Sequence, residues 1–211
     1  MNSVSRIKNL EIHGLEYTTI GTSNEPIEGI NHLNILDNNP GISGCGADAL
    51  LGEELAKKRG FDIKNSLKGK DIVIISAGLG RGTGAGATKI VARQAKEMGL
   101  ISIGVFTVPF SFEGKQRRTA ALEALVDIEP LLDCSVVIYN DHLLEIHENL
   151  ELTMQEAFLK ADNSLEKTIR LIQGLTESHE SKHTTIGIGS FHTPITSFLK
   201  RFFKSLYRSS L

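Results

Sequence analysis

A glycine-rich run at residues 78–86 is the stretch whose residue types could most clearly do chemistry. It reads GLGRGTGAG, with five glycines in nine residues and Thr83 among them. Glycine adopts positive φ angles and lets a ligand approach the backbone, and the unsatisfied N–H groups at a helix start attract anions. We interpret the run as a phosphate cradle and not as a packing device; a tight turn without a ligand is the alternative.

The kind of phosphate ligand does not follow from these residues. Gly80, Gly82 and Ala85 have the spacing of a dinucleotide-binding fingerprint, but that fingerprint also needs an acidic residue at the end of the next strand. The next predicted strand ends in Phe-Thr-Val at 106–108. A Walker motif is excluded as well, because no Gly-Lys-Ser/Thr follows the loop. The residues alone therefore indicate a nucleotide of unspecified kind.

The elements that must position this loop alternate between strand and helix patterns. Short runs rich in β-branched residues predict strands at 15–20, 71–76, 101–107 and 135–139, with one further short strand at 33–36. Apolar residues at helical spacing predict helices at 87–98 and 121–131, and a longer one at 152–175 that is broken near Ala161. Such alternation predicts an α/β fold with a parallel sheet, and a ligand at the carboxyl ends of its strands.

The glycine loop and several other segments resemble the tubulin/FtsZ family, in particular its bacterial cell-division branch. GLGRGTGAG is similar to the family's signature loop, which is GGGTGTG in its common bacterial form. Four further blocks are similar and follow in family order: SGCGADALLG at 43–52, VPFSFEGKQRR at 108–118, VVIYNDHLLEI at 136–146 and AFLKADNSL at 157–165. The resemblance covers roughly residues 2–175 and implies the family's three-layer, Rossmann-like nucleotide-binding domain.

The resemblance assigns a guanine nucleotide, GTP or GDP, to the predicted cradle. It implies that residues 80–86 hold the α- and β-phosphates and that residues 44–47 approach the γ-phosphate. It also implies contacts to the ribose and to guanine from side chains that follow later strands. The site residues implied are Gly44, Gly46, Ala47, Gly80, Arg81, Gly82, Thr83, Gly84, Gly86, Glu113 and Arg117 (ribose), and Asn140, Phe158 and Asp162 (base). Mg²⁺ is expected only together with the phosphates, and no metal site made of side chains is predicted.

Several of these residues also have plain structural explanations. Glu113 and Arg117 stand four apart and could form an exposed helical ion pair. Phe158 could belong to the core, and Asn140 and Asp141 could cap the helix that begins with them. Arg81 replaces a family glycine, as Ala85 replaces a threonine; Arg81 could contact a phosphate or could disturb the turn.

Two parts of the family pattern have no counterpart in the sequence. Residues 1–10 resemble the helix that follows the family's first strand, so we expect the first strand and first phosphate loop to be missing, with main-chain groups of two inner strands unpaired. The acidic loop that follows the long helix in the family, and acts in the next subunit, is not found after Leu175. No catalytic residue is therefore predicted, and whether the chain is an enzyme stays open.

The composition is that of an ordinary soluble globular protein. Its 211 residues are 40% hydrophobic and 23% charged, which excludes collagen, coiled coil and wholesale disorder. No apolar run is long enough to span a membrane and the first ten residues do not resemble a signal peptide, so we expect a cytoplasmic protein. Cys45 and Cys134 lie far apart and are expected to be small buried hydrophobes.

The net charge of −2 is unevenly distributed. Glu180 is the last acidic residue, and the five bases beyond it leave 18 bases against 25 acids in the rest of the chain. An acidic body argues against binding to nucleic acid. Residues 195–208 combine an apolar face with a basic one, which favours a membrane surface or an acidic partner; a helix docked on the sheet, or the readthrough product of an interrupted gene, are the alternatives.

These observations predict a guanine-nucleotide-binding domain at 1–176, incomplete at its N-terminus, and a linker with a basic amphipathic segment at 177–211, without the family's C-terminal activation domain. The predicted function is GTP-dependent filament assembly with family subunits at the bacterial division site, with hydrolysis impaired in the chain alone. The alternative is a non-catalytic interaction protein or gene fragment that caps or tethers filaments. A dinucleotide-dependent oxidoreductase is a third reading, opposed by the missing ribose acid.

Overall fold

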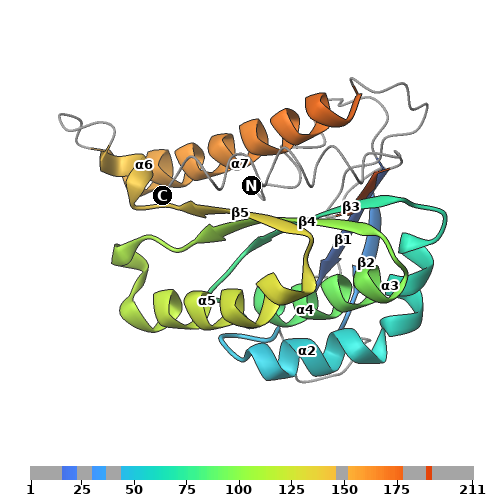
Figure 1. The fold of residues 1–211 in the computed structure, drawn as a ribbon. Helices are drawn as coiled ribbons and strands as arrows, with labels where there is room; N and C mark the ends of the chain where they lie inside the picture. Colours follow the sequence, from blue (N-terminus) through green and yellow to red (C-terminus); the bar gives the residue numbers. More distant parts are fainter. Residues whose placement is uncertain (1–15, 23–29, 37–43, 146–151, 178–188, 192–211) are drawn as a thin grey trace.

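The computed structural model describes residues 16–22, 30–36, 44–145, 152–177 and 189–191. The helix expected near the start of the chain and the basic segment at 195–208 lie outside the described residues. Within the described part, a central sheet is covered by helices on both faces (Figure 1).

The described residues form a six-stranded sheet in the order β2-β1-β6-β3-β4-β5. Its strands are β1 (Glu16–Gly21), β2 (Asn31–Asn34), β3 (Ile72–Gly78), β4 (Ile101–Val108), β5 (Cys134–Tyr139) and β6 (Gly189–Phe191). The pairs β1–β2, β3–β4 and β4–β5 are parallel, whereas β6 is antiparallel to both of its neighbours. The predicted parallel α/β sheet is confirmed, with its second strand two residues earlier than expected.

Strand β6 occupies the place where unpaired main-chain groups were expected. It lies between β1 and β3, with Ser190 opposite both Glu16 and Val73. Its pairing reaches Tyr17 on β1 and Ile74 on β3, which leaves the carboxyl-terminal halves of both strands beyond its register. The sequence did not predict this strand, because three residues are too short to show a strand period.

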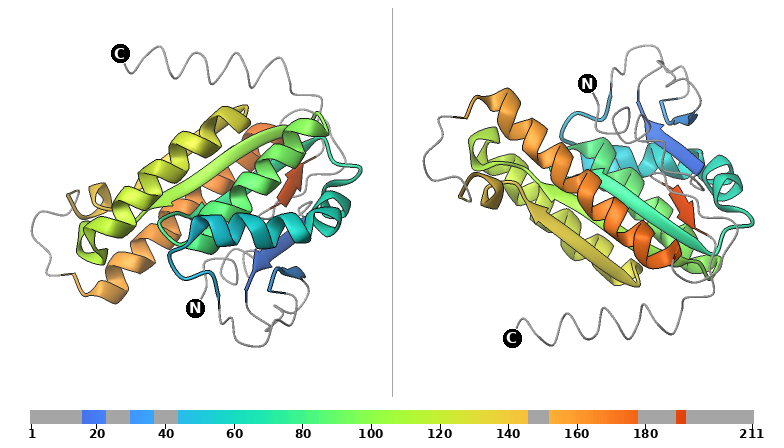
Figure 2. Two further views of the ribbon diagram at one scale, coloured as in Figure 1. Left: turned by 90° about the horizontal axis from the view of Figure 1, so that it is seen from below. Right: turned by 90° about the horizontal axis from the view of Figure 1, so that it is seen from above.

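Helices cover the sheet as two unequal layers (Figure 2). One face carries α2 (Ala49–Lys58), α3 (Gly60–Leu67), α4 (Gly82–Glu97) and α5 (Lys115–Ile128), and the other carries α7 (Met154–Glu177). The short elements are η1 (Ser111–Glu113), η2 (Glu129–Leu131) and α6 (His142–Glu145). The predicted helices at 87–98 and 121–131 correspond to α4 and to α5 with η2.

Successive residues of strand β3 point to opposite faces of the sheet and pack in two separate hydrophobic cores. Val73 and Ile75 of β3 pack in the cluster that includes α2, α4 and α5. Ile72 and Ile74 pack on the opposite face with Leu165, Ile169 and Ile172 of α7. Because both faces of the strand are buried, its sequence is continuously apolar and not alternating.

Helix α7 is continuous, so the predicted break near Ala161 is wrong. Ala161 is 6% exposed and packs with Ala157 and Phe110. Alanine is the best helix former, and its small side chain allows α7 to lie close to Phe110. The helix continues through the polar residues that follow, Asp162 and Asn163.

The two cysteines are free thiols; Cys45 is buried as expected, whereas Cys134 is only half-buried. Burial raises the pKa of Cys134 to about 12, with a smaller contribution from the charge of Asp133. Over the described part of the chain, the helices are either too short or too polar to cross a lipid bilayer.

Candidate functional site

The carboxyl ends of β3, β4 and β5 meet at one edge of the sheet. Gly78 at the end of β3 pairs with Thr107, and Val108 at the end of β4 pairs with Tyr139 of β5. The glycine loop, the segment 109–118 and Asn140 follow these three strand ends directly. The structure therefore brings the glycine loop, Glu113, Arg117 and Asn140 to a single edge, as the fold class requires.

Two helix N-termini meet at this edge. Residues Cys45 to Asp48 form a turn closed by a 2.9 Å hydrogen bond from Asp48 N to Cys45 O, and Asp48 caps α2 by accepting from Leu51 N at 3.0 Å. The N–H of Gly82, the first residue of α4, donates to Gly46 O at 3.0 Å. The start of α4 is thereby fixed against the loop that opens α2.

The first turn of α4 offers backbone donors at this junction. Its first i to i−4 hydrogen bond runs from Ala85 N to Arg81 O at 3.1 Å, so the N–H groups of Thr83 and Gly84 precede the first residue that has an acceptor within the helix. The helix dipole adds a partial positive charge at the same place. This arrangement suits a phosphate group.

Three glycines of the loop do serve packing, contrary to the sequence interpretation. A Cβ atom at Gly82 would collide with Asp48 O and lie 2.7 Å from Cys45 O. A Cβ atom at Gly86 would collide with the backbone of Glu53 and Ala49, and lie 2.5 Å from the carbonyl carbon of Gly52. A Cβ atom at Gly84 would collide with Gly78 O.

These contacts show that the glycines allow α4 to lie backbone against backbone on α2 and on the end of β3. The sequence held one signal of this role, because Gly82 and Gly86 are four residues apart and therefore share one face of a helix.

Gly80 is constrained in a different way, by its backbone conformation. Its φ angle is +90°, which favours glycine. An added Cβ atom would also lie 2.6 Å from Arg117 O and 2.8 Å from Pro109 Cγ. Gly46 likewise has a positive φ of +52°. The part of this edge that carries the predicted phosphate residues is thus built mainly from backbone. Its glycines have tight contacts or positive φ angles that disfavour other residues.

Glu113 and Arg117 form the ion pair that was the structural alternative. Arg117 donates to Glu113 Oε2 at 2.8 Å, and Phe110 N donates to Glu113 Oε1 at 3.0 Å. The Glu113 side chain is only 12% exposed, so the pair is partly buried and not a surface pair. Because Arg117 O also lies against Gly80, the pair links the segment after β4 to the glycine loop.

Three aromatic rings gather where β4 ends and α7 begins. Phe110 is fully buried, stacks on Phe112 at 4.8 Å and contacts Phe158 edge-on at 5.5 Å. Phe158 is 39% exposed, so it is not a plain core residue. Asp162 is partly buried and lies one helical turn further along α7, on the same side as Phe158.

Asn140 carries an unusual buried oxygen. The residue is 5% exposed, and its Oδ1 atom has no hydrogen-bond partner within the described part of the chain. At the start of α6, the backbone carbonyl of Asn140 accepts from Leu143 N at 3.1 Å. The Asn140 side chain therefore does not take part in that hydrogen bond. An acceptor buried without a donor costs about 1–3 kcal/mol, and such an atom fits a ligand that donates to it.

Asp141 fixes the backbone next to Asn140. Its Oδ1 atom accepts from Ser111 N at 2.7 Å, and its Oδ2 atom accepts from Arg118. Burial alone would raise the pKa of Asp141, but the hydrogen bonds from Ser111 and Arg118 outweigh it and hold that pKa below its usual value. The side chain therefore joins the segments that follow β4 and β5 and does not cap α6.

A partly buried ion network that sequence reasoning missed holds the helices behind the phosphate side. Lys89 of α4 lies 2.7 Å from Asp127 of α5 and 3.4 Å from Glu53 of α2. Burial would raise the pKa of Glu53, but Lys57 and Lys89 lower it overall. The available signal was the i, i+4 spacing of Lys89 and Arg93, which places two bases on one face of α4; Arg93 also lies 3.6 Å from Glu53.

Known proteins match most of this chain. Residues 11–148 match the model of the Tubulin/FtsZ family, GTPase domain. The chain is 36% identical to the cell division protein FtsZ of Aquifex aeolicus (strain VF5) over 177 residues, which are 82% of this chain and 48% of that protein. It is 34% identical to the FtsZ of Mycoplasmopsis pulmonis (strain UAB CTIP), over 81% of this chain and 44% of that one.

Solved structures agree with these matches. An empty FtsZ dimer from M. jannaschii superimposes with a TM-score of 0.73 at 33% identity, over 80% of this chain and 50% of that one. CetZ2 from Haloferax volcanii, solved as a GTPγS-bound protofilament, superimposes with a TM-score of 0.70 at 16% identity, over 85% and 57%, and shows the likeness of the fold alone. The chain spans about half the length of the curated relatives that it matches.

Proposed function

Because the chain belongs to the tubulin/FtsZ family, we propose that it binds GTP and GDP at the carboxyl edge of its sheet. The phosphates lie at the junction of α2 and α4, against the N–H groups of Thr83 and Gly84. The base lies at the end of β5, next to Asn140, with Phe158 and Asp162 beside it. Glu113 and Arg117, between these two ends, contact the ribose.

The observation that carries the proposal is the unpartnered buried Oδ1 atom of Asn140. Guanine presents N–H donors on its base edge, and a donor at this atom would relieve the unsatisfied acceptor. A second acceptor, the Asp162 carboxylate, distinguishes guanine from adenine because it can accept from two guanine donors at once.

The residues of this chain bind and orient the nucleotide. The backbone donors at the start of α4 hold phosphate charge without moving, since Gly82 and Gly86 fix that helix against α2. Mg²⁺ enters only with the phosphates, where it would neutralise part of their charge. In the family resemblance the acidic loop that orients the attacking water comes from a neighbouring subunit, so we expect slow hydrolysis by the chain alone.

Assembly into filaments with family subunits, at the division site, is the cellular role that we infer. A solved relative at 33% identity is an FtsZ dimer. Sedimentation of this chain together with an intact FtsZ subunit, with and without GTP, tests the inference. Absence of the chain from the pellet under both conditions would exclude it.

Calorimetric titration with GDP and with ADP tests the nucleotide site. We expect GDP to bind at least about tenfold more tightly than ADP, a difference of about 1.4 kcal/mol. Asn140→Ala should weaken GDP binding about tenfold or more, while the free energy of unfolding changes by less than about 1 kcal/mol because Oδ1 has no protein partner to lose. Asn65→Ala, on the exposed surface of α3, is the matched control and should bind GDP normally.

A folded wild-type chain that gives no heat with GDP would reject the proposal. That result would favour the alternative function, a non-catalytic interaction protein that caps or tethers filaments. Equal binding of GDP and ADP would retain a phosphate site but reject guanine recognition.

A further inference from the structure

We propose that the guanidinium group of Arg81 binds the phosphates of the nucleotide, as a side-chain cation added to the backbone donors of the loop. The inference rests on the proposed nucleotide site and names one residue that distinguishes this chain within it. The family's common signature loop has a glycine at this position and so has no side chain there to make the contact.

The backbone of the loop accepts Arg81 without strain. Its φ and ψ angles are −126° and 154°, an extended conformation that any residue adopts. The sequence left open whether Arg81 contacts a phosphate or disturbs the turn, and this backbone conformation excludes a disturbed turn. The tight positions are its neighbours: Gly80 has a positive φ, and Gly82 is closed off by Asp48 O and Cys45 O.

The loop leaves Arg81 as the position from which a long side chain can extend. Cβ atoms at Gly80, Gly82, Gly84 and Gly86 would meet protein atoms at once. Ala85 is buried, whereas Arg81 is exposed. Because Arg81 directly precedes the first turn of α4, its side chain starts beside the N–H groups of Thr83 and Gly84.

Arg81 also differs from the other described arginines in its lack of an ion-pair partner. Of the six arginines in the described residues, five make an ion pair with a carboxylate; these are Arg59, Arg93, Arg117, Arg118 and Arg170. The Arg81 side chain makes no hydrogen bond or ion pair within the described part of the chain. The nearest cap carboxylate, Asp48, already accepts from Leu51 N. An unpaired guanidinium beside two helix N-termini suits a phosphate, which it can bind through two parallel hydrogen bonds.

Binding of GDP, GTP and guanosine to the wild type and to variants tests the proposal, with guanosine measured by displacement of labelled GDP. Arg81→Gly should weaken GDP and GTP binding about tenfold to hundredfold, the usual range for losing hydrogen bonds to a charged group. Guanosine has no phosphate, so its affinity should stay unchanged. Arg81→Lys, which keeps the charge but not the paired geometry, should give an intermediate loss.

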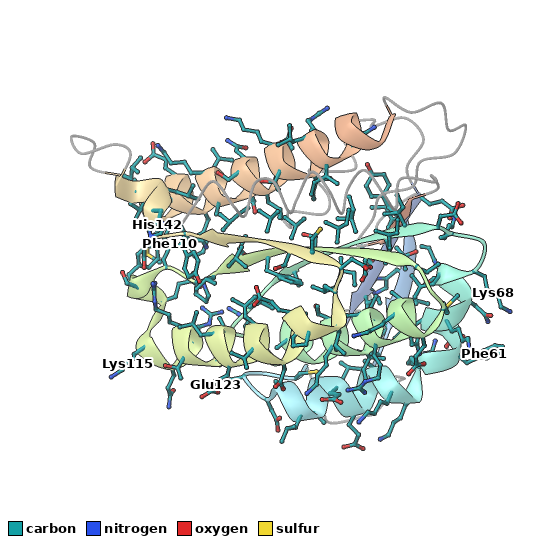
Figure 3. The ribbon with its side chains drawn as sticks, viewed as in Figure 1. Phe61, Lys68, Phe110, Lys115, Glu123 and His142 are labelled. Atoms are coloured by element: carbon teal, nitrogen blue, oxygen red, sulfur yellow. The ribbon has the colours of Figure 1, made fainter. Side chains whose placement is uncertain are left out.

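Lys68→Gly is the matched control. It removes one positive charge from an exposed position with extended backbone at the end of α3, remote from the strand ends marked by Phe110 and His142 (Figure 3). We expect this variant to bind GDP normally, and a loss equal to that of Arg81→Gly would overturn the proposal.

Two further results would also overturn it. Wild-type affinity for GDP in a folded Arg81→Gly variant would show that the side chain faces elsewhere, while the nucleotide site itself stands. An equal loss for guanosine would show that the substitution acts through the shape of the loop. If the wild type itself binds no GDP, the proposed function fails first.

Discussion

The phosphate side and the base side of the proposed nucleotide site are built in different ways. At the phosphate side, α2 and α4 meet backbone against backbone, and Gly82 and Gly86 leave no room for a methyl group. At the base side, single side chains project from strand and helix ends, including the buried Asn140 and the 39% exposed Phe158. One side therefore depends on packing, and the other on the chemistry of single side chains.

This difference separates the expected effects of mutations. A change at a packed glycine of the phosphate side, unlike one at Arg81, moves two helices and should lower stability and binding together. A change at the base side removes one contact from a frame that stays in place, so it should lower binding with little loss of stability. Three substitutions test this distinction.

Gly86→Ala should have the largest effect. The new Cβ atom collides with backbone of α2, which cannot move aside as a flexible side chain could, and we expect a loss of about 3 kcal/mol in the free energy of unfolding. Urea denaturation measures this loss, and binding of GDP should fall with it. Gly174→Ala is the control, because its Cβ atom on α7 meets nothing within 4 Å and should stabilise the protein by up to about 1 kcal/mol. Equal stabilities of the two variants would contradict the packing role.

Phe158→Ala should weaken GDP binding about tenfold, since stacking of an aromatic ring on a base contributes about 1–3 kcal/mol. The loss of stability should be smaller than for a fully buried ring, because 39% of Phe158 is exposed. Titration calorimetry and thermal unfolding measure the two effects. Phe61→Ala on α3, where the ring is 75% exposed, should change neither. If Phe158→Ala lost stability while binding GDP normally, the ring would be structural.

Asp141→Asn should have the smallest effect and should depend on pH. The folded-state pKa of Asp141 is lowered, so its carboxylate adds stability above its unfolded pKa of about 4 and loses it as the pH falls through the lower folded pKa. We expect the variant to be about 1–2 kcal/mol less stable at pH 7, with the difference shrinking toward pH 2. Urea denaturation across this range checks it. Glu123→Gln, on the exposed face of α5, should stay within about 0.5 kcal/mol of the wild type throughout; a constant deficit for Asp141→Asn would show that its charge is not what matters.

The local elements of the fold were predictable from the sequence. The strand and helix patterns around 72–97 produced β3, the loop and α4 in the right order, because their apolar spacing reflects burial on fixed faces. The break predicted near Ala161 is wrong, because α7 continues through that position. Packing of Ala157 and Ala161 on Phe110 keeps the helix intact there.

The candidate site was predicted in part. Resemblance to the family located its residues along the chain, and the structure brings the strand ends that carry them to one edge. The ribose, base and phosphate contacts themselves stay predictions until a nucleotide is titrated. The dual use of the loop glycines, for a ligand and for packing, was not predicted.

By itself the sequence determined the order of strands and helices, the donor-rich start of α4 and the residue types along the site. Only the tertiary structure decided that α2 lies against Gly82 and Gly86, that β6 enters the sheet between β1 and β3, and that Asn140 is buried with an unused oxygen. The physical reason is that periodicity reports which face of an element is buried, whereas these features depend on which distant segment buries it.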